Sequence, residues 1–196
     1  MINAIIFDWF GVCTEKWINV WEHELSDKVE GKKLRESFFK YLDKYANNSI
    51  TGKEFLKSIC SEIDLDPEKY DYLLSTKGKI NKELLEIIKK LKKKYKTAIL
   101  SDNFNEIVPV FEREIGGFER YFDVIILSNR LNIGKTNPEI YKITLARLGI
   151  NPINAIFIDD KEKNLLLARK LGIKTILYKN NIQLEKELVK HDIILP

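Results

Sequence analysis

Histidine and cysteine are scarce in this sequence of 196 residues, which has two of each: His23, His191, Cys13 and Cys60. Two histidines exclude a histidine-rich metal cluster. The cysteines lack CxxC spacing, which argues against a structural zinc site and against a disulfide framework. Nine glycines and five prolines are too few for a low-complexity linker. The chemistry of the chain must therefore come from other residue types.

Long apolar runs and an excess of one charge are also absent. No run approaches the roughly 18 apolar residues of a membrane span, and a β-like segment begins at once without a basic leader region. We therefore expect a cytoplasmic protein with no membrane partner. The 33 Lys and Arg against 29 Asp and Glu give a net charge of +4. The longest basic cluster, 89–96, ends an amphipathic helix and is best interpreted as a solvated face, so we expect no nucleic-acid partner.

The hydrophobic pattern predicts one α/β unit with a helical insertion. A buried strand is expected over 2–7, followed by purely helical patterns at 17–29, 32–45, 51–63 and 67–75. The pattern then alternates, with strands at 97–101, 123–127, 155–159 and 174–178 between helices at 81–95, 104–114, 138–148, 161–171 and 182–190. Five apolar strands joined by helices predict a Rossmann-like, doubly wound parallel sheet with a small all-helical insert.

Polar residues follow four of the predicted strands, at the edge where open parallel sheets bind ligands. They are Asp8, the run Ser101, Asp102 and Asn103, then Lys135, and finally Asp159 and Asp160. Each of these residues alone could have a purely structural role, since Asp and Ser are common in turns and helix caps. Together they provide a carboxylate nucleophile, oxygen ligands for Mg²⁺ and groups for a phosphate, which predicts phosphoryl-transfer chemistry.

Four segments carry a family resemblance: FDWFGV at 7–12, ILSDN at 99–103, GKTNPEIY at 134–141 and FIDDKEKN at 157–164. Together they resemble the four motifs of the haloacid dehalogenase (HAD) superfamily, in particular its members with a helical cap after the first motif. The resemblance covers the whole chain. It implies a HAD-like core made of residues 1–13 and 80–196, with residues 14–79 as the cap.

The resemblance also implies roles for individual residues. Asp8 would be the covalent nucleophile, and Ser101 and Lys135 would hold the substrate's phosphate. Asp102 and Asn103 would belong to the same substrate-binding site. A Mg²⁺ ion would be bound by Asp8, Asp159, Asp160 and the backbone carbonyl of Phe10, with Asn164 in support. The expected partner is a small phosphorylated substrate, and we expect a monomer or weak homodimer.

The chain departs from the family's phosphatases at Phe10, where those enzymes have a second Asp that protonates the leaving group and then activates water. Losing a general acid/base costs about 10²- to 10⁴-fold in rate; Asp102 is the nearest substitute. The preferred function is a Mg²⁺-dependent phosphatase of a small metabolite that forms an aspartyl-phosphate on Asp8. The alternatives are a catalytically weak phosphate- or partner-binding protein and a 2-haloacid dehalogenase-type hydrolase, since such dehalogenases resemble this chain in having an aromatic at this position.

Four aromatic residues lie near the predicted site. Trp9 and Phe10 belong to its first loop, and either shape a pocket or pack against the sheet. Trp17 and Trp21 are spaced i, i+4 on a predicted helix, so we expect both in the core of the helical insert.

Overall fold

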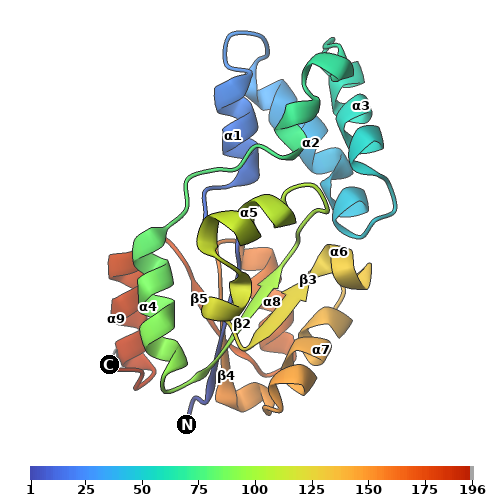
Figure 1. Cartoon of the computed structure of the whole chain (residues 1–196). Helices are drawn as coiled ribbons and strands as arrows, with labels where there is room; N and C mark the ends of the chain where they lie inside the picture. The colour runs from blue at the N-terminus through green and yellow to red at the C-terminus, as the bar shows by residue number, and fades with distance from the viewer. Residues whose placement is uncertain (195–196) are drawn as a thin grey trace.

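The five predicted strands form one parallel sheet in the computed structural model, which describes residues 1–194 (Figure 1). The strands are β1 (Ala4–Phe7), β2 (Lys96–Ser101), β3 (Val124–Leu127), β4 (Ala155–Asp159) and β5 (Lys174–Leu177), in the order β3-β2-β1-β4-β5. Because β1 is central and pairs with both β2 and β4, the carboxyl ends of these three strands are neighbours. This confirms the predicted α/β fold.

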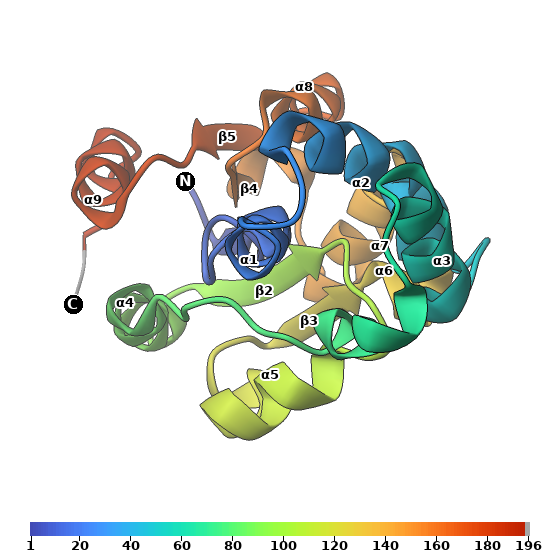
Figure 2. The same cartoon turned by 90° about the horizontal axis from the view of Figure 1, so that it is seen from above.

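Helices cover both faces of the sheet (Figure 2). One face carries α4 (Lys82–Lys92), α5 (Val108–Ile115) and α9 (Asn181–Lys190), and the other carries α7 (Glu139–Leu148) and α8 (Glu162–Lys170). Side chains of β1 alternate between the two cores: Ile5 and Phe7 face the first, Ala4 and Ile6 the second. A strand that is buried on both faces consists of consecutive apolar residues, so β1 could be predicted from the sequence.

A helical insert, residues 14–79, lies over the carboxyl ends of the strands (Figure 1). It contains α1 (Trp17–Glu24), α2 (Gly31–Ala46), α3 (Gly52–Glu62) and two 3₁₀ turns, η1 (Pro67–Lys69) and η2 (Asp71–Leu74). The chain enters and leaves side by side: the Glu15 N–H donates to the Lys79 carbonyl, and the Asn81 N–H to the Cys13 carbonyl, each at 2.9 Å. This short antiparallel pair joins the insert to the sheet.

Several element boundaries differ from the prediction. The helix expected over 67–75 is two 3₁₀ turns, in which only Leu73 and Leu74 are buried, so little apolar area supports a full helix. The helix expected over 17–29 ends at Glu24, just before Ser26 and Asp27, residue types that favour turns. The helix expected over 104–114 begins at Val108, because the next residue is a proline, which fits only the first turn of a helix.

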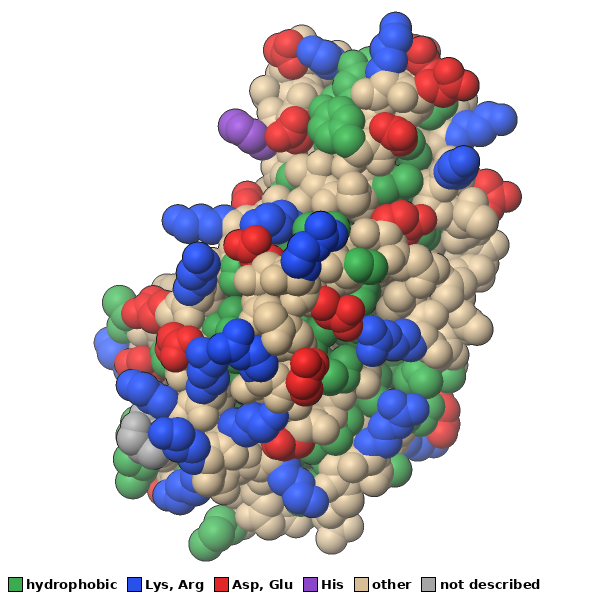
Figure 3. Space-filling model, viewed as in Figure 1, with side chains coloured by type: hydrophobic (Ala, Val, Ile, Leu, Met, Phe, Trp, Pro, Cys, Tyr) green, Lys and Arg blue, Asp and Glu red, His purple; other side chains and the backbone are tan. Residues whose placement is uncertain are grey.

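Short elements complete the chain: α6 (Ser128–Leu131), η3 (Phe118–Arg120) and η4 (Pro152–Asn154), none of which was predicted. Within residues 1–194, no helix combines the length and the apolar character needed to cross a membrane. The surface in Figure 3 mixes basic and acidic side chains over the whole face, as the near balance of charge implied.

Candidate active site

Three charged side chains meet at the carboxyl ends of neighbouring strands. Asp8 follows β1, Asp159 ends β4, and Lys135 comes from the loop before α7. The Lys135 Nζ lies 2.7 Å from Asp8 Oδ1 and 2.7 Å from Asp159 Oδ2. All three residues are at most 3% exposed. The structure thus brings together residues that stand up to 151 positions apart (159 minus 8) in the sequence, as the motifs predicted.

Asp160 adds a third carboxylate. Oxygen atoms of Asp8, Asp159 and Asp160 lie within 4.8 Å of one another. Both carboxylate oxygens of Asp160 are buried without a hydrogen-bond partner; the ammonium of Lys16 lies 2.7 Å from one of them, as an ion pair without hydrogen-bond geometry. Two ammonium groups, those of Lys135 and Lys16, form ion pairs with these three carboxylates, and Lys161 lies nearby without an ion pair to them. An oxygen-rich site of this kind suits a hard cation such as Mg²⁺.

Gly11 leaves room for the Asp160 carboxylate. Its backbone has φ +85°, and a Cβ built there would lie 2.6 Å from Asp160 Oδ2. Only glycine meets both demands at this position. The turn after β1 thus supplies a nucleophile candidate and a cradle for a second carboxylate.

Burial and charge shift the pKa values of the cluster in different directions. Burial, reinforced by the negative charge of Asp159, raises the pKa of Asp8 to about 8. Burial acts in the same direction on Asp159, but Lys135 and hydrogen bonds outweigh it and lower the pKa of Asp159 below its usual value. Burial opposes the charge of Lys135, yet Asp159 and Asp8 raise its pKa well above normal. An additional cation beside Asp8 would favour its ionised form.

Asp159 is oriented by the start of α8. The Lys161 N–H donates to Asp159 Oδ1 at 2.7 Å, and the Asn164 amide donates to both carboxylate oxygens at 3.1 and 3.0 Å. Asn164 is buried, so it can hold the carboxylate in one orientation. This matches the supporting place that the motif implied for it.

Ser101 ends β2, and Asp102 and Asn103 follow it. Asp102 lines the cavity above Asp8 and accepts the Lys135 N–H at 2.8 Å. Ser101 and Asn103 are buried beside the cavity and do not line it. The Ser101 hydroxyl donates to the Asp102 carbonyl, and Asn103 Oδ1 accepts the Phe104 N–H. The Nδ2 of Asn103 has no partner, so this amide retains an unused donor.

The cavity above Asp8 has a volume of about 50 Å³. Its floor contains Asp8, Asp102 and Lys135, joined by Lys16 and Lys161, which the sequence did not single out because lysine is abundant throughout the chain. The remaining lining is apolar: Phe10 and Phe104 from the core, and Trp17, Ile18, Phe38, Phe39 and Leu42 from the insert. No motif signals this apolar lining, because it depends on how the insert packs over the sheet.

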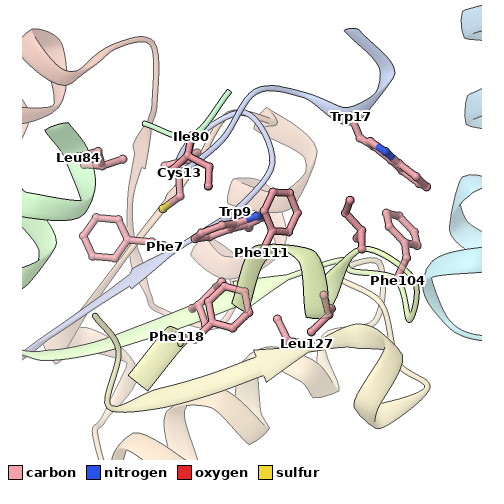
Figure 4. Packing of buried hydrophobic residues seen from close by; sticks show 14 of the residues in the cluster. Phe7, Trp9, Cys13, Trp17, Ile80, Leu84, Phe104, Phe111, Phe118 and Leu127 are labelled. Carbon is pink, nitrogen blue, oxygen red and sulfur yellow. The ribbon is translucent and has the colours of Figure 1, made fainter. Parts of the chain in front are cut away.

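The four aromatic residues near the site divide into two groups. Trp9 packs under the sheet edge against Phe111 and Phe118 at 5.1 and 5.0 Å between ring centroids (Figure 4), whereas Phe10 lines the cavity. Trp21 lies in the insert core, as predicted. Trp17 does more: it stacks on Phe104 at 4.6 Å and lines the cavity. The expectation for Trp17 was incomplete because this residue lies where the insert meets the core, and it contacts both the insert core and the cavity.

Comparison with known proteins points to one family. The model of the haloacid dehalogenase-like hydrolases matches residues 2–172. Acyl-CoA dehydrogenase family member 10 of Mus musculus is 30% identical over 89% of this chain, but the chain covers only 18% of that protein. This chain thus spans about a fifth of the length of some curated relatives. D-ribitol-5-phosphate phosphatase of Bacteroides thetaiotaomicron is 27% identical, with 81% of this chain and 73% of the relative covered.

A solved structure shows the same fold. A HAD family enzyme of Bacteroides thetaiotaomicron superposes with a TM-score of 0.70 and 26% identity, covering 91% of this chain and 94% of its own. Its magnesium complex superposes with a TM-score of 0.65 at 26% identity, covering 91% and 93%. With a family model matched over most of its length and the four motifs assembled at one sheet edge, the chain belongs to the haloacid dehalogenase-like hydrolases.

Proposed function

We propose that this protein is a Mg²⁺-dependent phosphatase of a small phosphorylated compound, with Asp8 as the nucleophile. The observation that carries the proposal is the buried contact of Asp8 with Lys135, beside two further carboxylates and beneath a cavity. The phosphatase and the magnesium complex among its relatives support the same chemistry. The helical insert would act as the cap that shields the site from water.

Asp8 is held for attack by two donors. Lys135 Nζ and the Trp9 N–H both lie within hydrogen-bond distance of Asp8 Oδ1, at 2.7 and 2.6 Å, which fixes the orientation of the carboxylate. In the first step a carboxylate oxygen of Asp8 bonds to phosphorus as the ester P–O bond breaks. Lys135 would balance negative charge on the nucleophile and on the phosphoryl group.

The carboxylates fit a magnesium ion. The buried oxygens of Asp160 lack hydrogen-bond partners, and Gly11 keeps the space in front of them open. Asp8, Asp159, Asp160 and the backbone carbonyl of Phe10 would hold the ion. When bound, Mg²⁺ supplies positive charge that lets Asp8 ionise and draws the phosphate oxygens toward it.

Steady-state hydrolysis tests the proposal. Wild type, Asp8→Asn and the exposed control Asp64→Asn would be assayed with 4-nitrophenyl phosphate and acetyl phosphate, with Mg²⁺ and with EDTA. We expect Mg²⁺-dependent turnover in the wild type and in Asp64→Asn, and its loss in Asp8→Asn. Activity that survives in Asp8→Asn or in EDTA would contradict the proposal. Halide release from 2-chloropropionate without Mg²⁺ would instead indicate a dehalogenase, and phosphate binding without any turnover would indicate a binding protein.

A further inference from the structure

The cavity above Asp8 pairs a charged floor with an apolar roof. The charged lining residues belong together: Lys16 contacts Asp160, Asp102 contacts the backbone of Lys135, and Lys161 directly follows Asp160. These groups match the phosphate end of a substrate. Apart from Lys16, which is paired with Asp160, the side of the cavity formed by the insert carries the indole of Trp17, two phenyl rings and two aliphatic chains. The leaving group of the substrate would therefore contact mainly these apolar side chains.

The roof offers no neutral hydrogen-bonding side chain. None of the lining residues has a hydroxyl or amide side chain. The indole N–H of Trp17 donates to the Thr76 carbonyl at 3.2 Å and is already used. The nearby Tyr45 hydroxyl is bonded to Glu106 and does not line the cavity. Each sugar or polyol hydroxyl buried here without a partner would cost about 1–3 kcal/mol.

A sugar phosphate also needs a proton donor for its leaving group, and Phe10 does not provide one. Its ring is fixed among aromatic neighbours, with centroids 6.2 Å from Trp17, 6.0 Å from Phe104 and 5.7 Å from Phe111. It cannot donate a proton to a departing alkoxide. The cavity is narrow, with about 50 Å³ open to the centres of water-sized molecules, which further favours a compact group.

We infer that the substrate carries a small, apolar leaving group that departs without a proton, as in an acyl phosphate or an aryl phosphate. The inference rests on the phosphatase function proposed above. A carboxylate leaving group has a pKa of about 4, like Asp or Glu side chains, and leaves as an anion at neutral pH. A sugar alkoxide does not leave as an anion at neutral pH and needs a proton donor. Phe10 cannot donate a proton, and its aromatic side chain fits a substrate whose leaving group needs no proton.

The two steps balance without a general acid. An oxygen of Asp8 bonds to phosphorus, the bond from phosphorus to the leaving oxygen breaks, and its electron pair stays on the departing carboxylate or phenolate. Water then bonds to phosphorus, the Asp8 carboxylate departs, and both protons of the water remain on inorganic phosphate. No oxidant, reductant or further reactant is required.

A substrate panel tests the inference on the wild-type protein with Mg²⁺. It contains acetyl phosphate, 4-nitrophenyl phosphate, phenyl phosphate and D-ribitol 5-phosphate. We expect kcat/KM for the first two to exceed the values for the last two by about 10²-fold or more. Ribitol phosphate turnover within tenfold of that of acetyl phosphate would overturn the inference while leaving the phosphatase function standing. Hydrolysis of none of the four would remove the phosphatase function itself, and this inference with it.

Two variants separate the role of Phe10 from intrinsic substrate reactivity. Phe10→Asp should raise the ratio of kcat/KM for phenyl phosphate to kcat/KM for acetyl phosphate by about 10²-fold or more. Phe10→Asn, which is polar but not acidic, should not. An equal response of both variants would contradict the argument. Should Phe10→Asp fail to fold, Leu42→Asn adds a hydrogen-bonding group to the roof. It should improve ribitol phosphate relative to 4-nitrophenyl phosphate by about tenfold, and an unchanged ratio would count against the apolar roof.

Discussion

At the scale of single residues, Asp8 combines complete burial with close charges of both signs. Its contact with Lys135 stabilises the ionised carboxylate, but burial and Asp159 oppose ionisation more strongly, and the net result is a pKa of about 8. Without a metal ion, the folded protein therefore keeps a proton on its candidate nucleophile at pH values where the unfolded chain has released it. Two predictions concern this loop.

Replacing Asp8 by Asn should stabilise the metal-free protein, increasingly so as the pH rises. The folded-state pKa of about 8 lies above the ordinary aspartate pKa of 3.8. An acid whose pKa is raised on folding makes unfolding easier as the pH rises between these two values. The advantage of Asp8→Asn in melting temperature should thus grow from about pH 4 to about pH 8 and then level off. Thermal denaturation in EDTA, with Asp64→Asn as the control, would refute this if the advantage were flat across the range.

Replacing Gly11 by Ala should weaken Mg²⁺ binding. The added Cβ would lie 2.6 Å from Asp160 Oδ2 and displace that carboxylate. Disturbing a group that supports a metal ligand typically costs 10- to 100-fold in affinity, and we expect about that loss by calorimetric titration. Gly172→Ala is the matched control: its φ is also +85°, but the added Cβ approaches only Pro152, at 3.6 Å. Equal affinity losses in both variants would show that backbone strain, not contact with Asp160, is responsible.

At the scale of elements, the helical insert is docked by the turn after α2. Asn48, with φ +59°, donates from Nδ2 to the Asn129 carbonyl at 2.7 Å and to Asn132 Oδ1 at 2.6 Å. The Ser128 hydroxyl donates to the Ala46 carbonyl at 2.7 Å. These polar contacts, with the stack of Trp17 on Phe104, hold the roof of the cavity above Asp8.

Removing the Asn48 side chain should loosen this docking. Asn48→Gly keeps the left-handed backbone but loses three hydrogen bonds, two donated by Nδ2 and one that Oδ1 accepts from Asn105, each worth about 0.5–1.5 kcal/mol. Amide exchange at residues 46–49 should accelerate about tenfold or more. Asp64→Gly is the control, because Asp64 also has positive φ, +58°, but lies in the insert away from this contact. Unchanged exchange in Asn48→Gly would mean that the hydrogen bonds of Asn48 do not hold the insert in place.

Periodicity predicted the strands and most helices because their side chains are buried on regular faces. Periodicity failed at two places. Helix α5 begins only at Val108 because Pro109 must lie in the first turn of the helix. The segment 67–75 buries too little apolar area to sustain an α-helix. The charged site was predictable because Asp8, Lys135 and the acidic pair follow strands of one parallel sheet. Lys16 and the aromatic lining were not, since their placement depends on packing between the insert and the core.

At the scale of the whole molecule, the site concentrates negative charge inside a chain whose net charge is +4. Lysines and acidic residues are mixed over the face seen in Figure 3. The buried cluster instead has three carboxylates whose ion-pair partners are Lys135 and the partly exposed Lys16. The fold must either keep a proton in this cluster or bind a cation there. Metal binding should therefore be coupled to global stability.

Magnesium should raise the melting temperature through this cluster. A ligand at about 100 times its Kd stabilises the folded state by about 2.7 kcal/mol, which for a chain of this size corresponds to roughly 5–10 °C. Differential scanning fluorimetry should show this rise in wild type and in Asp64→Asn and its loss in Asp160→Asn. A rise of equal size in Asp160→Asn would place the ion elsewhere.

Trapping the phosphoenzyme would show whether Asp8 takes up the phosphoryl group covalently. The protein would be mixed with acetyl phosphate and Mg²⁺, quenched in acid within the first turnover, digested and mapped by mass spectrometry, with Asp8→Asn in parallel. We predict one phosphoryl group on the peptide that contains Asp8 and none on that peptide in the variant. Phosphate released without any labelled peptide, or a label on a residue other than Asp8, would contradict the account.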